Sequence, residues 1–270
     1  MSYFTLKNGM KLYYEMSGSG STVVMMHGWS ANHEIYSEPA AILSKSARCI
    51  IYDHRGHGGS KAANAEAPTM ETLADDLQEL IEGLGLSDIT LVGWSMGACA
   101  AMNYVRKYGC SALRQVVLCD MSPRLLNDEE WKMGLYQGHY TKEDMEHDET
   151  MSPTRQYRKF LLGTIPKLQK LPGLLLWLVL RKQLRKCDIP VLSSLGHSMQ
   201  SQDNRDVIAQ INVPLTYFYA DPGSLFLPDL AEWYSTHASV PVKTVRFAES
   251  THMLIAEHPE QFAAELEKLL

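Results

Sequence analysis

The stretch "TLVGWSMGACAAMNYV", residues 90–105, determines which fold we predict for this chain. An apolar run leads into Gly93, Ser95 and Gly97, which match G-x-S-x-G, and small residues at helical spacing follow. A strand that turns sharply into a helix needs room on both sides of the turn, and glycine supplies it because it has no Cβ. The pattern therefore predicts that the Ser95 hydroxyl lies at the carboxyl edge of a sheet, facing the N-terminus of a helix.

Short apolar runs elsewhere alternate with stretches of helical periodicity. The runs are "TVVMMH" (22–27), "RCIIYD" (48–53) and "QVVLCD" (115–120), and "METLADDLQELIEGLGL" (70–86) is typical of the helices between them. Asn8-Gly9 is a hairpin signal between two strands at the start of the chain. Strands that alternate with helices favour βαβ units. We therefore predict an α/β fold with a mostly parallel sheet and helices on both faces.

The alternation stops after residue 120 and resumes near "VPLTYFYA" (213–220). Residues 121–209 are polar, rich in methionine and mostly helical in character. We predict one α/β core formed by residues 1–120 and 210–270, with residues 121–209 inserted as a helical cap.

Composition narrows the class of protein. The 270 residues are 45% hydrophobic and carry a net charge of −6, which excludes disorder and argues against general nucleic-acid binding. No signal peptide is evident, and the longest apolar run, residues 174–180, is too short to span a bilayer. We therefore expect a cytoplasmic protein. The five cysteines form no C-x-x-C motif, no dinucleotide, phosphate or metal motif is present, and no cofactor is expected. The oligomeric state stays open.

Three further segments extend the pattern around Ser95. They are "HGWS" (27–30), "DHRGHGGS" (53–60) and "STHMLIAEHPEQF" (250–262). With these segments the chain resembles the α/β-hydrolase family over nearly its whole length. The resemblance implies a serine hydrolase with a nucleophile elbow and an inserted cap, in which Ser95 is the nucleophile.

The resemblance also implies the other catalytic roles. His252 is the expected base, and the backbone amides of Met96 and Trp29 are the expected oxyanion hole. Two carboxylates compete for the role of acid. Asp120 ends its strand directly, whereas Asp221 falls two residues before the position that most relatives use. We favour Asp120 and keep Asp221 as the alternative.

Charge is distributed unevenly along the cap. Residues 155–186 hold nine Lys or Arg and no Asp or Glu, so the remainder of the chain carries −15. We expect the helix in this segment to pack its apolar face on the core and to solvate its basic ends. The alternative is a basic rim around an apolar mouth, suited to an anionic substrate or an anionic membrane surface.

The leading functional hypothesis is hydrolysis of a carboxylic ester or thioester with an apolar acyl group, through an acyl-enzyme intermediate. One alternative is a cofactor-independent dioxygenase of heteroaromatic substrates, in which the histidine deprotonates the substrate. Another is a ligand receptor built on a hydrolase fold.

Overall fold

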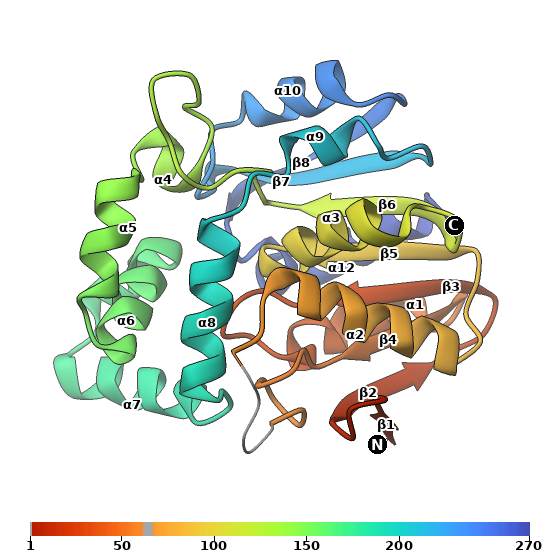
Figure 1. The fold of residues 1–270 in the computed structure, drawn as a ribbon, viewed down its shortest axis with the longest axis horizontal. Coiled ribbons are helices and arrows are strands. Elements are labelled where there is room, and N and C mark those ends of the chain that lie inside the picture. Colours follow the sequence, from red (N-terminus) through yellow and green to blue (C-terminus); the bar gives the residue numbers. More distant parts are fainter. Residues whose placement is uncertain (1, 62–66) are drawn as a thin grey trace.

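An eight-stranded sheet forms the centre of the molecule, in the order β1-β2-β4-β3-β5-β6-β7-β8 (Figure 1). The computed structural model describes residues 2–61 and 67–270. β1 pairs with β2 and β2 pairs with β4 in antiparallel register, and every later pair is parallel. The strands are Ser2–Thr5, Lys11–Ser17, Ser21–Met26, Ala47–Tyr52, Ile89–Trp94, Leu113–Cys119, Leu215–Gly223 and Val242–Thr251. The predicted α/β class with a mostly parallel sheet is confirmed.

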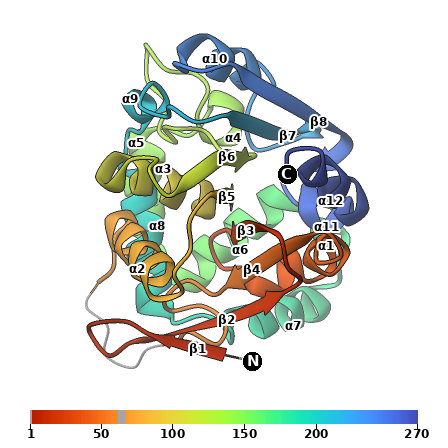
Figure 2. The same cartoon turned by 90° about the vertical axis from the view of Figure 1, so that its right-hand side faces the viewer.

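Helices cover both faces of this sheet (Figure 2). On one face lie α2 (Met70–Gly83), α3 (Met96–Tyr108) and α10 (Leu230–His237), and on the other lie α1 (Ser37–Leu43), α11 (Leu254–Glu257) and α12 (Pro259–Glu267). The central strands bury both faces: every residue of β5 is buried. Two apolar cores, one on each side of the sheet, therefore hold the carboxyl ends of β5 and β6 in place.

A helical insert lies between β6 and β7, beside the sheet in Figure 1. It comprises α4 (Leu135–Gly138), α5 (Lys142–Glu149), α6 (Pro153–Thr164), η2 (Pro166–Lys170), α7 (Gly173–Leu184) and α8 (Ile189–Gln200). The predicted helical insertion is confirmed, and the bounds 121–209 stay a prediction.

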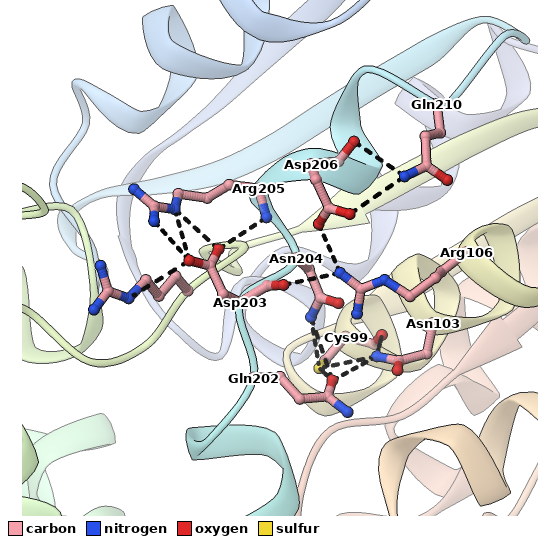
Figure 3. A network of polar contacts seen from close by, with 10 residues as sticks. Cys99, Asn103, Arg106, Gln202, Asp203, Asn204, Arg205, Asp206 and Gln210 are labelled. Carbon is pink, nitrogen blue, oxygen red and sulfur yellow. Dashed lines mark hydrogen bonds and ion pairs between the residues drawn. The ribbon is translucent and has the colours of Figure 1, made fainter.

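A polar network fastens the chain to α3 where it leaves α8 (Figure 3). Arg106 of α3 donates to the backbone oxygen of Asp203 at 2.8 Å and to the carboxylate of Asp206 at 2.6 Å. One turn earlier on α3, the amide of Asn103 donates to Gln202 at 2.7 Å. The helix that begins at the elbow therefore also anchors the end of the insert, through α9 (Arg205–Ile208) and the residues just before it.

Helix α7 departs from expectation. We expected its apolar face to pack on the core, but only Leu176 and Leu180 of the run 174–180 are buried. The other five residues of this run are at least 40% exposed. Leu176 and Leu180 form a small cluster with Tyr157 of α6, and this cluster is separate from the two main cores. The expectation was wrong because only this narrow stripe of α7 finds apolar partners.

Candidate active site

Ser95 occupies a strained turn at the end of β5. Its backbone has φ 54° and ψ −119°, a combination that costs a non-glycine residue free energy and is found mainly at functional sites. The two glycines of the motif make the turn possible. A Cβ on Gly93 would collide with the backbone of Gly97, and a Cβ on Gly97 would collide with the carbonyl of Met26. The turn leaves Ser95 at the N-terminus of α3, where free amide groups carry partial positive charge.

Asp120 follows β6 directly, and its side chain meets His252. The Oδ2 atom of Asp120 lies 2.7 Å from Nδ1 of His252, and both side chains are buried. The other carboxylate oxygen, Oδ1, accepts from the Ser224 hydroxyl at 2.8 Å and from the Ala220 amide at 3.2 Å. Because a carboxylate only accepts hydrogen bonds, Nδ1 of His252 carries the proton and Nε2 is left with a lone pair.

The loop after β8 holds His252 by its backbone and by its ring. The backbone amide of His252 donates to Gly223 at 3.2 Å, and the indole of Trp94 donates to the His252 carbonyl at 2.9 Å. The imidazole packs against the rings of Trp94 and Phe226. Its Nε2 atom is buried without a hydrogen-bond partner among the described residues. A buried acceptor left without a partner is costly and is typical of a group that meets its partner in the reaction.

Asp221 is occupied elsewhere. Its carboxylate pairs with Arg246 of the neighbouring strand β8 at 2.7 Å and is partly exposed. Of the two carboxylates that the sequence offered as the acid, the structure brings only Asp120 to His252.

The loop 27–30 lies against Ser95. A Cβ on Gly28 would lie 3.1 Å from the Cβ of Ser95 and 2.9 Å from the ring of Trp94, so only glycine allows this approach. The Trp29 indole donates to the Leu192 carbonyl of α8 at 2.8 Å, which ties the loop to the insert. The backbone amides of Trp29 and Met96 have no acceptor in the described part of the chain.

Three buried histidines, His27, His54 and His57, lie in or next to the loop 27–30 and hold its backbone in place. His27 accepts at Nε2 from the His54 amide at 3.0 Å, and His57 accepts at Nε2 from the Ser30 amide at 3.3 Å. Burial lowers the pKa of all three imidazoles, and neighbouring imidazoles lower those of His27 and His54 further; the pKa of His54 falls to about 3. Asp53 completes the support by accepting from the His33 and Gly59 amides. These contacts fix the backbone of the loop 27–30 and of residues 53–60.

Two cavities meet at Ser95, and both are also lined by Trp29 and Phe160. The larger, of about 520 Å³, extends over Met121, Leu125 and Leu135 to two carboxylates of α5 and polar residues of α8. The smaller, of about 380 Å³, is lined by His252 and extends towards η2 and α7. We refer to them below as the larger and the smaller cavity.

Sequence reasoning missed Ser224 and Phe160. Nothing near "ADPGSLF" marks Ser224, because its contact with Asp120 arises only when β7 pairs with β6. Phe160 likewise looks like an ordinary helix residue until α6 is placed over the sheet edge. Among the described residues, no group of three or more histidine, cysteine, aspartate or glutamate side chains is arranged to hold a metal ion.

None of the helices in the described ranges has both the length and the apolar character that crossing a bilayer requires. All five cysteines are buried and free.

Comparison with known proteins shows a family match. The sequence profile described as the alpha/beta hydrolase fold matches residues 21–259. A non-heme chloroperoxidase of Kitasatospora aureofaciens is 35% identical over 127 residues, which are 47% of this chain and 46% of that protein. The alignments with this and two further haloperoxidase relatives span less than half the length of those proteins.

Other relatives match over nearly the whole chain. A pimeloyl-[acyl-carrier protein] methyl ester esterase of Nitrosomonas europaea is 23% identical over 94% of this chain and 97% of its own. The solved structure of an esterase from Exiguobacterium antarcticum superposes with a TM-score of 0.83 at 25% identity, covering 99% of this chain and 98% of the esterase.

Proposed function

The chain belongs to the alpha/beta hydrolase family, and from this premise we propose that it is a serine hydrolase of carboxylic esters or thioesters that works through an acyl-enzyme. The observation that carries the proposal is the fixed His252 imidazole, which has Asp120 on Nδ1 and an unpartnered Nε2 and shares a cavity with the strained Ser95.

The proposed nucleophile is Ser95. Nε2 of His252 takes the proton of the Ser95 hydroxyl as the oxygen attacks the acyl carbon, and Asp120 stabilises the imidazolium that results. His252 then gives this proton to the departing alcohol or thiol, leaving the acyl group on Ser95. Water then attacks the acyl carbon while Nε2 of His252 takes one of its protons, and His252 returns that proton to the Ser95 oxygen as the bond to the acyl carbon breaks and the acid leaves.

The proposed oxyanion hole consists of the backbone amides of Trp29 and Met96. Each amide lacks an acceptor in the described part of the chain, and each belongs to a segment that adjoins Ser95. Negative charge develops on the former carbonyl oxygen in the transition state, so donors fixed in advance stabilise it selectively. One such donor contributes about 3 kcal/mol in related chemistry.

The two cavities suggest how the substrate is divided. The leaving group must receive its proton from His252, and His252 lines the smaller cavity but not the larger. We therefore assign the leaving group to the smaller cavity and the acyl group to the larger. Met121, Leu125 and Phe226 line the larger cavity near the catalytic end, which favours an apolar acyl group.

Active-site labelling provides the test. A fluorophosphonate probe should label the wild-type protein at Ser95, and Ser95→Ala should abolish both labelling and the hydrolysis of nitrophenyl esters. Ser122→Ala is a matched control, because Ser122 is a buried serine near the end of β6 that lines neither cavity. Turnover that persists in Ser95→Ala would refute the proposal.

The same preparations separate the alternatives. If oxygen is consumed with a heteroaromatic substrate, and Ser95→Ala still consumes it, the protein has the dioxygenase activity instead. Tight binding of a ligand without turnover of any ester would identify a receptor.

A further inference from the structure

The exposed helix α7 of the insert has an unusual surface. Leu174 is 70% exposed, and Trp177, Leu175, Leu178 and Val179 are between 40% and 50% exposed. These are five of the seven large hydrophobic residues that stand out as exposed in the described chain; the other two, Tyr3 and Met16, lie on β1 and β2. A cluster of this kind marks an interaction site in a folded protein.

The apolar side chains cover most of the circumference of α7. At 100° per residue, Leu176 and Leu180 share the one buried stripe, and the exposed residues spread over the remaining arc. In Figure 1, α7 lies at the lower edge of the insert, at the outside of the molecule. A convex apolar helix of this shape fits a medium that deforms around it better than it fits a rigid groove.

Cations flank this apolar run in the sequence, and three of them lie at the end of α7 itself or just after it. Of the nine Lys and Arg in 155–186, Lys159 pairs with Asp148 and Lys186 pairs with Glu34. The other seven form no ion pair with any described carboxylate: Arg155, Arg158, Lys167, Lys170, Arg181, Lys182 and Arg185. Arg181 lies over the Trp177 ring at 4.9 Å, so positive charge reaches the apolar surface itself. An unpaired cluster of cations in a chain with a net charge of −6 favours an anionic partner.

These features together point to one occupant. Two copies meeting through α7 would bring two sets of unpaired cations together, which opposes a symmetric dimer. A lipid bilayer with anionic head groups accepts leucine and tryptophan side chains into its interface and attracts the surrounding lysine and arginine residues. We propose that α7, with the basic residues on either side of it, docks the protein on an anionic lipid surface.

The smaller cavity gives this surface a connection to the site. Val179 of α7 and Leu168 of η2 line that cavity together with Ser95 and His252. Val179 is 40% exposed, so one side chain belongs both to the docking surface and to the cavity wall. If the proposed function holds, docking brings the leaving-group cavity next to the lipid, and an ester with an amphiphilic leaving group reaches Ser95 from the membrane.

Vesicle binding tests the proposal without relying on turnover. The full-length chain is mixed with vesicles of equal parts phosphatidylglycerol and phosphatidylcholine, or of phosphatidylcholine alone, and binding is measured by co-sedimentation. We expect binding to the anionic vesicles that weakens with added salt, and roughly tenfold weaker binding to the neutral ones. Trp177 is the most exposed of the five tryptophans, so its emission should shift to shorter wavelength on binding.

Matched variants assign the binding to α7. Leu174→Ser with Trp177→Ser, and Arg181→Glu with Lys182→Glu, should each weaken binding roughly tenfold or more. The apolar control is Tyr3→Ser with Met16→Ser, which removes the other exposed apolar residues. The charge control is Lys45→Glu with Arg48→Glu, which makes the same change in net charge at the amino end of β4, on the edge of the sheet opposite the catalytic residues. Both controls should bind as the wild type does, and near- and far-ultraviolet circular dichroism should show that every variant is folded.

Several outcomes would overturn the proposal. Absence of binding to anionic vesicles would do so, as would binding that both α7 variants retain. An α7-dependent dimer in sedimentation velocity, or α7-dependent capture by an acidic carrier protein without vesicle binding, would assign the surface to a protein partner instead. All measurements are repeated with Ser95→Ala, whose vesicle binding should match the wild type, so failure of docking is distinguished from failure of the hydrolase proposal.

Discussion

Oδ2 of Asp120 and Nδ1 of His252 lie 2.7 Å apart, although 132 positions separate the two residues in the chain. The parallel pairing of β6 with β7 and of β7 with β8 produces this contact, because it brings the carboxyl ends of the strands to one edge. Asp120 has a backbone φ of 44°, so the residue turns sharply as it leaves β6. The contact between Asp120 and His252 fixes the tautomer of the imidazole.

Asp120→Asn should lower kcat by roughly 10³–10⁴-fold, because an amide can donate to Nδ1 and so favours the tautomer whose Nε2 is protonated. The matched control is Asp221→Asn, which removes the ion pair with Arg246 on the surface and should leave kcat within about twofold. Steady-state kinetics on one nitrophenyl ester would check both variants. A larger loss in Asp221→Asn than in Asp120→Asn would reverse the assignment of the acid.

Ser224→Ala tests a positioning residue. The variant removes the 2.8 Å hydrogen bond to Oδ1 of Asp120 and leaves only the longer bond from the Ala220 amide. A hydrogen bond to a charged group contributes about 1.5–3 kcal/mol, so kcat/KM should fall roughly 10- to 100-fold. In an Asp120→Asn background the same substitution should cost much less, since the charge it supports is gone. Equal losses in the two backgrounds would show that Ser224 has only a general structural role.

The contacts of these residues show how far the sequence alone could lead. The turn at Ser95, the position of His252 after the last strand and the position of Asp120 at the end of "QVVLCD" are local patterns, because glycine spacing and strand ends are read from adjacent residues. Their catalytic roles stay predictions. The contributions of Ser224 and Phe160 could not be predicted, because they depend on which strands are neighbours and on where the insert lies.

The outer surface of α7 was unpredictable for a related reason. The run "LLLWLVL" has the composition of a buried helix, and periodicity alone does not state how many neighbours will cover it. Only the three-dimensional arrangement shows that one stripe finds partners within the insert.

Gly28→Ala tests the approach of the loop 27–30 to the nucleophile. The added Cβ would lie 2.9 Å from the Trp94 ring and 3.1 Å from the Cβ of Ser95, so the loop must move away from Ser95. We expect kcat to fall roughly 100-fold, the size of losing one oxyanion donor, with a smaller change in KM. The control is Gly173→Ala, whose Cβ would meet no atom within 4 Å and which should keep the wild-type kcat. An unchanged kcat in Gly28→Ala would argue against a role for the Trp29 amide.

Filling one cavity at a time tests the division of the substrate. Met151 lines the larger cavity and Leu168 lines the smaller, and both side chains are half-buried. Met151→Trp should reduce kcat/KM for long-chain acyl esters by roughly 10- to 200-fold and spare acetyl esters. Leu168→Trp should do the same for bulky alcohols and spare methyl esters. A crossed set of esters would measure this, and the opposite pairing of variant and substrate would exchange the two assignments.

The buried histidines predict a pH dependence of stability. Burial lowers the pKa of His27, His54 and His57 in the folded state, whereas an unfolded histidine titrates near ~6.5. Below that pH the unfolded state binds protons that the folded state does not, so the free energy of unfolding falls as the pH falls. At His33 burial lowers the pKa, but Asp53 together with Glu15 and Glu34 outweighs burial and raises it. The stability that His33 contributes is therefore complete below pH ~6.5 and is lost as the pH rises above that value.

His54→Phe isolates one of these contributions. Neither ring nitrogen of His54 has a hydrogen-bond partner among the described residues, so phenylalanine removes the titration without breaking a bond. The folded pKa of His54 is about 3. Between pH 7 and pH 5 the free energy of unfolding of the variant should therefore fall by about 2 kcal/mol less than that of the wild type. Urea unfolding at constant ionic strength would measure the difference. The control is Tyr52→Phe, which removes the hydroxyl of a buried ring beside His54. Tyr52 stays neutral in this pH range, so the variant should keep the wild-type pH dependence of stability. A change as large as that of His54→Phe would show that the effect comes from packing and not from titration.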